Sequence, residues 1–351
     1  MNLILLLLFQ LIMTKNINKT KIGTRNSLTA KEYFDGILIG NTSILSKSIT
    51  LIESSLLEHQ KIAEELIELC LPKSGNSIRV GITGVPGVGK STYIESLGTY
   101  LIEEKNKKVA VLTIDPSSKK SGGSILGDKT RMNSLSVNNN AFIRPSPSSG
   151  TLGGVAKATR ETIILCEAAG FDTILIETVG VGQSEIEVKS MVDFFLLLML
   201  AGAGDELQGI KRGIMEIADA IFINKADGEN IDKANIAIQE YKNAIHFFPK
   251  NDNKWIPKVD SCSALENKNI DITWETIESF VTLTTSNGHF NQNRKQQAKY
   301  WLEHTINSSI TALFYSNSNI KSKMNELESQ VINEEISPFK AARDLLAIFK
   351  S

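Results

Sequence analysis

The sequence predicts an α/β fold with a mostly parallel sheet covered by helices. Between residues 78 and 259, short apolar runs alternate with segments whose apolar residues recur at helical spacing, and strands that alternate with helices pair in parallel. The 351 residues are 42% hydrophobic and 22% charged, which is typical of a globular chain and excludes a disordered or collagen-like one. Helical patterns without strands flank this region and predict a helical extension at each end.

Seven apolar runs are expected to form the strands. They cover residues 78–83, 109–114, 141–143, 173–176, 194–200, 220–223 and 255–259. Before them, an apolar stripe at helical spacing predicts a helical segment from about Asn41 that ends at Pro72 and Gly75. After them, two further stripes predict helices, and their members are Leu302, Ile306, Ile310 and Leu313, then Phe339, Ala342, Leu346 and Phe349.

We therefore divide the chain into four parts. Residues 1–40 are a leader and polar segment that we expect to be poorly ordered, 41–75 are an N-terminal helical segment, 76–288 are the α/β domain, and 289–351 are a helical tail. Because the tail follows a completed domain, its apolar stripe has little else to cover, and we expect it to form a homodimer contact. The alternative is packing within one chain.

The first residues are strongly apolar but do not read as an export signal. The run from Leu3 to Leu8 is too short to span a bilayer, and the first positive charge, Lys15, comes after it rather than before it. We expect the physiological start to be Met13, with a weak anchor or signal as the alternative. The expected location is cytoplasmic, without stable membrane association.

Charge and cysteine content exclude several other classes of function. The chain has 38 basic and 39 acidic residues, so no overall field draws it to nucleic acid, and we expect no nucleic-acid partner. Its three cysteines are Cys70, Cys166 and Cys262, and this number and wide spacing fit neither a disulfide framework nor a Cys-x-x-Cys metal site. We expect them to be buried, reduced side chains.

A glycine-rich segment after the first strand predicts a phosphate-binding loop. Residues 84–91 read GVPGVGKS and match G-x-x-x-x-G-K-S between an expected strand and helix, which indicates a P-loop NTPase. Its backbone N–H groups and the following helix would hold phosphates, with Lys90 reaching the β and γ phosphates and Ser91 ligating Mg2+. The expected nucleotide contacts here are Gly84, Pro86, Gly87, Val88, Gly89, Lys90, Ser91 and Thr92.

Two carboxylates follow strands at the edge where open α/β sheets bind ligands. Asp115 comes after the strand 109–114, and Glu177 comes after 173–176. In nucleotide hydrolases, one such acid holds Mg2+ and another positions the attacking water. The structural alternative for Asp115 is a turn cap formed with Pro116. Gln183 is a further candidate to orient water, although its spacing from Gly180 differs from the usual Gly-Gln pair.

The residues after strand 220–223 predict recognition of guanine. They read Asn224-Lys225-Ala226-Asp227, and a carboxylate at Asp227 can accept hydrogen bonds from guanine N1–H and its exocyclic amine, a donor pair that adenine lacks. The segment Ser263-Ala264-Leu265 would then cover guanine O6 with its backbone. The nucleotide is therefore expected to be GTP, hydrolysed to GDP and phosphate.

With these motifs, the chain resembles the methylmalonyl-CoA mutase-associated GTPases of the MeaB/ArgK type, also described as transport-system kinases. The resemblance rests on residues 117–132, on ETVGVGQS at 177–184 and on GDELQGIKRG at 204–213, and it extends from about Asn41 to the end. It implies a homodimeric G-protein chaperone that gates cobalamin loading into a B12-dependent acyl-CoA mutase and protects that enzyme. It also implies that Asp115, Asp128 and Glu177 serve Mg2+ and hydrolysis, and that the loop around Lys211 is a switch.

Two arginines and two other functions complete the sequence-based expectations. Arg131 and Arg212 are candidates to neutralise transition-state charge, and Arg212 belongs with Gln183 and Lys211 to the expected switch; the alternative for each arginine is an ordinary surface position. A metal-insertion GTPase is disfavoured because the four histidines are scattered. A transport-system kinase is disfavoured because Asp227 selects guanine.

Overall fold

The sheet at the centre of the molecule has seven parallel strands. The computed structural model describes residues 28–114, 132–145, 152–178, 184–202, 212–249 and 252–350. The strand order is β3-β2-β4-β1-β5-β6-β7, so β1 lies in the middle between β4 and β5. The strands are β1 Ile78–Gly84, β2 Val109–Ile114, β3 Ala141–Arg144, β4 Thr173–Thr178, β5 Phe194–Leu200, β6 Ala220–Asn224 and β7 Lys258–Ser261.

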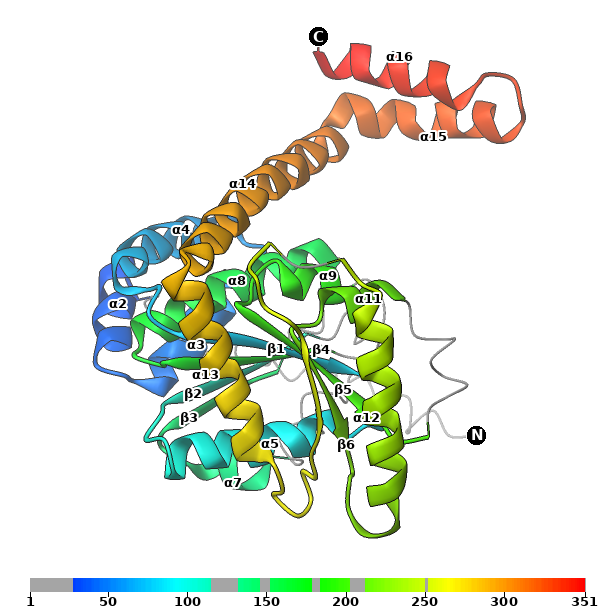
Figure 1. The fold of residues 1–351 in the computed structure, drawn as a ribbon. Helices are drawn as coiled ribbons and strands as arrows, with labels where there is room; N and C mark the ends of the chain where they lie inside the picture. The colour runs from blue at the N-terminus through cyan, green and yellow to red at the C-terminus, as the bar shows by residue number, and fades with distance from the viewer. Residues whose placement is uncertain are drawn as a thin grey trace, which may run out of the picture.

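Helices surround this sheet (Figure 1), which confirms the predicted α/β architecture. β2, β4 and β6 are buried along their whole length, as expected of parallel strands covered on both faces. We call residues up to Ser286 the body of the molecule. Its helices and 3-10 turns that follow β1 along the chain are α5 Lys90–Glu103, α7 Asn133–Val137, α8 Leu152–Ala168, α9 Ser184–Lys189, α11 Arg212–Ile217, η3 Gly228–Asn230, α12 Ile231–His246 and α13 Ile270–Ser286.

The last strand begins later than the sequence predicted. The expected strand covered residues 255–259, whereas β7 begins at Lys258. Trp255 is instead buried, and its indole Nε1 donates to the carbonyl of Asp219 at 2.8 Å. Pro257 lacks an N–H for pairing with β6, so the strand starts only after it.

The expectation of a poorly ordered segment up to residue 40 is wrong for residues 30–38. They form α2 Ala30–Leu38, which precedes α3 Thr42–Ile52, α4 Leu57–Cys70 and the 3-10 turn η1 Leu71–Lys73. Thr29 and Glu32 form a capping box at the start of α2. Tyr33, Phe34 and Ile37 are buried in the main core, so packing and the cap together stabilise this helix.

The tail consists of three helices that lead away from the body. α14 His289–Ser316 extends outward, and α15 Ser318–Ile332 and α16 Pro338–Lys350 lie at its far end (Figure 1). The predicted stripe on α14 is solvent-exposed in the single chain, with Leu302 61% and Leu313 62% exposed. On α16, Ala341 and Leu345 are buried, whereas Phe339 of the predicted stripe is 87% exposed.

The structure bears on two further features of the chain, its cysteines and its helices as candidate membrane spans. All three cysteines are free and buried, as the sequence predicted. Within the residues that the structure describes, no helix combines the length and hydropathy needed to cross a bilayer.

Candidate nucleotide-binding site

The predicted phosphate loop connects the central strand β1 to the start of α5. Gly84 ends β1, and a Cβ at this position would lie 2.4 Å from the carbonyl oxygen of Leu198, so any larger residue would push the loop away from β5. Gly89 has φ 92° and caps the start of α5, a left-handed conformation that glycine adopts at little cost. Pro86, Gly87 and Thr92 are exposed at the mouth of the loop. The strand, loop and helix thus have the arrangement that binds phosphate.

Lys90 folds back over this loop. Its Nζ donates to the carbonyl oxygen of Gly84 at 3.0 Å. Burial lowers the pKa of Lys90, while the charges of Glu177 and Glu185 act in the opposite direction. The two carboxylates therefore favour the ammonium form, which is the form that binds phosphate oxygens.

Ser91 and Glu177 are brought together from two elements. Glu177 lies in β4 beside Ile82 of β1 and is only 6% exposed. The hydroxyl of Ser91, in the first turn of α5, donates to Glu177 Oε1 at 3.1 Å. A hydroxyl and a carboxylate are oxygen donors of the kind that Mg2+ prefers, so this pair fits half of the predicted metal set. The other two members, Asp115 and Asp128, lie outside the described residues.

The predicted base-recognition residues hold the phosphate loop from the β6 side. Asn224 Nδ2 donates to the carbonyl of Val88 at 2.8 Å, and Lys225 Nζ donates to the carbonyl of Gly87 at 2.8 Å. Asn224 is almost fully buried, so these bonds join the end of β6 firmly to the loop. Two segments that lie 136 residues apart in the sequence are therefore joined by hydrogen bonds.

The segment predicted to cover the base lies against the same residues. The hydroxyl of Ser263 donates to the carboxylate of Asp227, and the Ala264 N–H donates to Asn224 Oδ1 at 3.1 Å. Ser263 also exchanges two backbone hydrogen bonds with Lys268, at 3.1 and 3.0 Å, which close the loop into a tight turn. The structure thus brings together Asn224, Lys225, Asp227, Ser263, Ala264 and Leu265 next to the phosphate loop.

The expected switch residues are not tested by this structure. Arg131, Gln183 and Lys211 lie outside the described residues, as do Asp115 and Asp128. Arg212 begins α11, but its side chain is not described. The roles assigned to these residues remain predictions.

Sequence reasoning missed one acidic residue of this site. Glu185, in the first turn of α9, is fully buried, and its charge acts on Lys90. It comes only a few residues after β4, so an acid at the start of the next helix was a signal that could have identified it. The structure adds Glu185 to Glu177 as a second carboxylate whose charge acts on Lys90.

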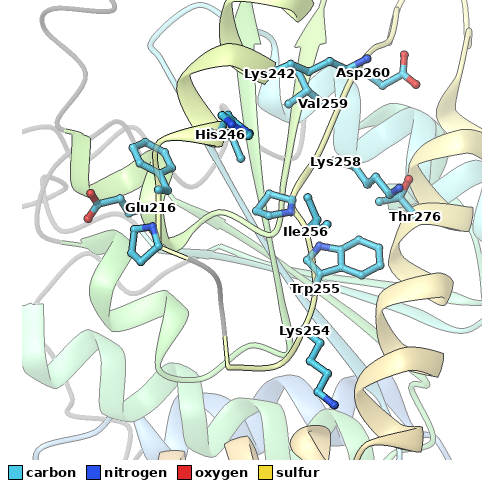
Figure 2. Close-up of a pocket in the computed structure, with 14 residues that line it drawn as sticks. Glu216, Lys242, His246, Lys254, Trp255, Ile256, Lys258, Val259, Asp260 and Thr276 are labelled. Atoms are coloured by element: carbon cyan, nitrogen blue, oxygen red, sulfur yellow. The ribbon is translucent and has the colours of Figure 1, made fainter.

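A hollow lies away from these residues, beside β7 and the C-terminal part of α12. Its volume is about 860 Å³, and Figure 2 shows Trp255 and Ile256 near its centre with Lys258 and Thr276 to one side. The neighbouring strand β7 is the edge of the sheet, and the N–H of its last residue, Ser261, already donates to Asp260 Oδ1 at 2.7 Å. None of the predicted nucleotide-binding residues lines this hollow.

Comparison with known proteins identifies relatives over most of the chain. The family model described as methylmalonyl-CoA mutase-associated GTPase MeaB matches residues 45–319. A probable GTPase of Mycobacterium tuberculosis is 50% identical over 309 residues, which are 88% of this chain and 92% of that protein. GTPase ArgK of Escherichia coli is 45% identical over 320 residues, covering 91% of this chain and 96% of that protein.

Two further matches extend the comparison to an animal protein and to a solved structure. The mouse mitochondrial protein named methylmalonic aciduria type A homolog is 42% identical over 328 residues, covering 91% of this chain and 79% of that protein. A crystal structure titled LAO/AO transport system kinase superposes with a TM-score of 0.74 at 37% identity, covering 94% of this chain and all of that one.

Proposed function

Because this chain belongs to the methylmalonyl-CoA mutase-associated GTPase family, we propose that its GTPase activity serves a B12-dependent acyl-CoA mutase, most simply methylmalonyl-CoA mutase. The protein would act as a chaperone whose nucleotide state gates cobalamin loading and protects the loaded enzyme. This client is supported by the name of the family and by the similarity to the mouse protein named for methylmalonic aciduria. In this proposal, GTP and water give GDP and phosphate, and the mutase responds to which nucleotide is bound.

The observation that carries the proposal is the hydrogen-bonded link between the phosphate loop and the segment predicted to cover the base. Asn224 donates to Val88 of the phosphate loop and accepts from Ala264 of the base loop, at 2.8 and 3.1 Å. A nucleotide held by its phosphates at one end and its base at the other would therefore contact a single hydrogen-bonded unit. Because both ends of the nucleotide would contribute to binding, we expect the affinity for a guanine nucleotide to exceed that for phosphate alone, as a GTP-dependent switch requires.

Charge neutralisation is the main chemical task of the proposed site. Lys90 would bind the β and γ phosphates, and the backbone N–H groups of the phosphate loop would bind the remaining oxygens. Ser91 and Glu177, with Asp115 and Asp128, would hold Mg2+, which when bound supplies positive charge to the phosphates. Asp227 would accept the two guanine hydrogen bonds, and Ser263 holds its carboxylate in place.

The client proposal is tested by binding and turnover with a purified mutase. We expect immobilised methylmalonyl-CoA mutase to retain the protein to different extents with a non-hydrolysable GTP analogue and with GDP, and we expect added mutase to raise GTP turnover. The Lys90→Ala variant should show no such nucleotide dependence. Equal retention with both nucleotides together with unchanged turnover would contradict the proposed client.

We also propose that the tail pairs two copies of the chain. The exposed stripe on α14 is continuous with helical spacing, and Leu302, Ile306 and Ile310 are 61%, 47% and 53% exposed. Monomers rarely leave apolar rows of this kind in water. Burial of the stripe against a second copy would remove it from solvent.

The dimer is tested by light scattering after size-exclusion chromatography. We expect the wild-type protein to elute with the mass of two chains and Ile306→Glu with the mass of one, because a buried carboxylate would lack a partner. Ser308→Glu adds the same charge at another exposed position of α14 and should leave the dimer intact. A wild-type mass of one chain at micromolar concentration would exclude the pairing.

A further inference from the structure

A serine of α5 donates to a carbonyl group of the base loop, by which we mean the segment Ser263-Ala264-Leu265 that is predicted to cover guanine. The hydroxyl of Ser96 donates to the carbonyl oxygen of Ala264 at 2.6 Å, across 168 positions of sequence. α5 also carries Lys90 and Ser91 in its first turn, so one helix contacts both the phosphate-binding and the base-covering parts of the site. Neither the motifs nor the family description assigns a role to Ser96.

The neighbouring backbone groups of this loop already have partners. The Ala264 N–H donates to Asn224 Oδ1 at 3.1 Å, and both backbone groups of Ser263 pair with Lys268. The next donor in the loop is the Leu265 N–H, for which the described residues provide no recorded acceptor. Leu265 is 80% exposed, so this part of the loop is accessible to a ligand.

Peptide geometry couples Ser96 to that remaining donor. The Ala264 C=O and the Leu265 N–H belong to one planar trans peptide unit, in which the two groups point in opposite directions. A hydrogen bond that fixes the carbonyl therefore fixes the direction of the N–H. Ser96 is itself held in place because the flanking Tyr93 and Leu97 are fully buried.

We propose that Ser96 is a positioning residue for guanine specificity, which it confers by aiming the Leu265 N–H at O6 of the base. This inference rests on the proposed guanine site. O6 accepts a hydrogen bond, whereas adenine presents an amino group at the same position. A fixed N–H donor would therefore bind guanine and leave two donors facing each other with adenine.

The test compares three nucleotides in the full-length protein by calorimetry. 6-Thio-GTP keeps the N1–H and the 2-amino group but replaces O6 with sulfur, a weak acceptor, whereas inosine triphosphate keeps O6 and lacks the 2-amino group. We expect Ser96→Ala to weaken GTP and inosine triphosphate binding by about three- to tenfold, the size of one hydrogen bond. Binding of 6-thio-GTP should change little, so the preference for GTP over 6-thio-GTP should approach one.

Two further variants separate positioning from general loosening of the helix. Ser96→Thr retains a hydroxyl and should restore the preference for GTP over 6-thio-GTP. Thr99→Ala, on the same helix and similarly half-buried, should leave all three affinities unchanged. An equal loss for all three nucleotides in Ser96→Ala, or an unchanged preference for GTP over 6-thio-GTP, would overturn the inference.

The affinity for inosine triphosphate distinguishes a failure of the proposed guanine site from a failure of the proposed role of Ser96. If the wild-type protein binds inosine triphosphate as tightly as GTP, the proposed contact between Asp227 and the 2-amino group fails, because removal of that group then costs no affinity. If it prefers GTP but Ser96→Ala has no effect on O6 discrimination, only the role of Ser96 fails.

Discussion

The two ends of the central sheet use polar side chains in opposite ways. At the carboxyl end, Asn224, Lys225 and Ser96 donate to loop carbonyls and so hold loops in place around a ligand site. At the amino end, charged side chains pair with one another, and donors from α14 bind backbone carbonyls and so anchor that helix. Polar groups therefore shape a site at one end and stabilise the fold at the other.

The amino end contains two ion pairs joined through the segment before β1, and a further pair between Lys189 and Asp219. Arg294 of α14 forms two bonds to Asp193, at 2.8 and 2.7 Å, and also donates to the carbonyl of Ser77 at 2.6 Å. Arg79 of β1 forms two bonds to Glu167, at 2.9 and 3.0 Å. Burial alone would raise the pKa of Glu167, but Arg79 and hydrogen bonds from Ser77 and Gly75 outweigh it and hold the pKa below its usual value.

The same end of the sheet anchors the tail. Gln297 Nε2 donates to the carbonyl of Val192 at 2.7 Å, and the indole of Trp301 donates to the carbonyl of Ser190 at 3.2 Å. With Arg294, these bonds fasten the first three turns of α14 to the segment before β5. Changes at this end should therefore affect folding and leave nucleotide affinity alone, whereas changes at the carboxyl end should do the reverse.

The largest expected effect is at the carboxyl end. Lys90→Ala removes the charged donor to the phosphates, and we expect GTP affinity to fall by at least about a hundredfold because hydrogen bonds between charged groups are strong. Calorimetric titration measures this loss. Thermal unfolding should be nearly unchanged, and a variant that unfolds at much lower temperature would break the comparison between the two ends.

The next effect is a change of nucleotide preference. Asp227→Asn replaces an acceptor with an amide that can donate to the C2 carbonyl of xanthine, so GTP should bind about tenfold to a hundredfold more weakly and xanthosine triphosphate more tightly. Competition of the two nucleotides against a fluorescent GDP measures the shift. Unchanged preference for GTP would refute base recognition by Asp227.

The smallest effect on nucleotide binding is expected at the amino end. Arg294→Ala leaves Asp193, with a side chain that is 1% exposed, without its cation, and should lower the free energy of unfolding by about 3 kcal/mol. Denaturant unfolding measures the loss, and Lys295→Ala, at the exposed neighbouring position, is the control. A large decrease in GTP affinity for Arg294→Ala would show that the two ends are not independent.

Much of the fold could be predicted because its signals are local. Apolar runs located all seven strands, with the start of β7 as the main error, and the glycine pattern located the phosphate loop. α2 was missed although its four buried residues recur at helical spacing, because this stripe is short and directly follows a polar segment. The capping pair Thr29 and Glu32 marks its start. A short helix is set by packing against the core as much as by its own sequence.

The contacts between distant residues could not be predicted. Arg294 and Asp193 are 101 positions apart, and Ser96 and Ala264 are 168 apart, so no local pattern pairs them. A serine within a helix usually has no ligand-related role, and nothing near Ser96 distinguishes it from Thr99 in the sequence. Asn224 and Asp227 were found because their spacing forms a motif.

The short helix α9 stands between the surroundings of the phosphate loop and the tail. Its first turn carries Glu185, whose charge acts on Lys90, and the carbonyl of its last residue, Lys189, accepts from Gln297 of α14 at 3.5 Å. A helix of six residues is only about 9 Å long. The carboxylate that acts on the lysine of the phosphate loop and an anchoring contact of the tail therefore stand at the two ends of one short helix, within about 9 Å of each other along its axis.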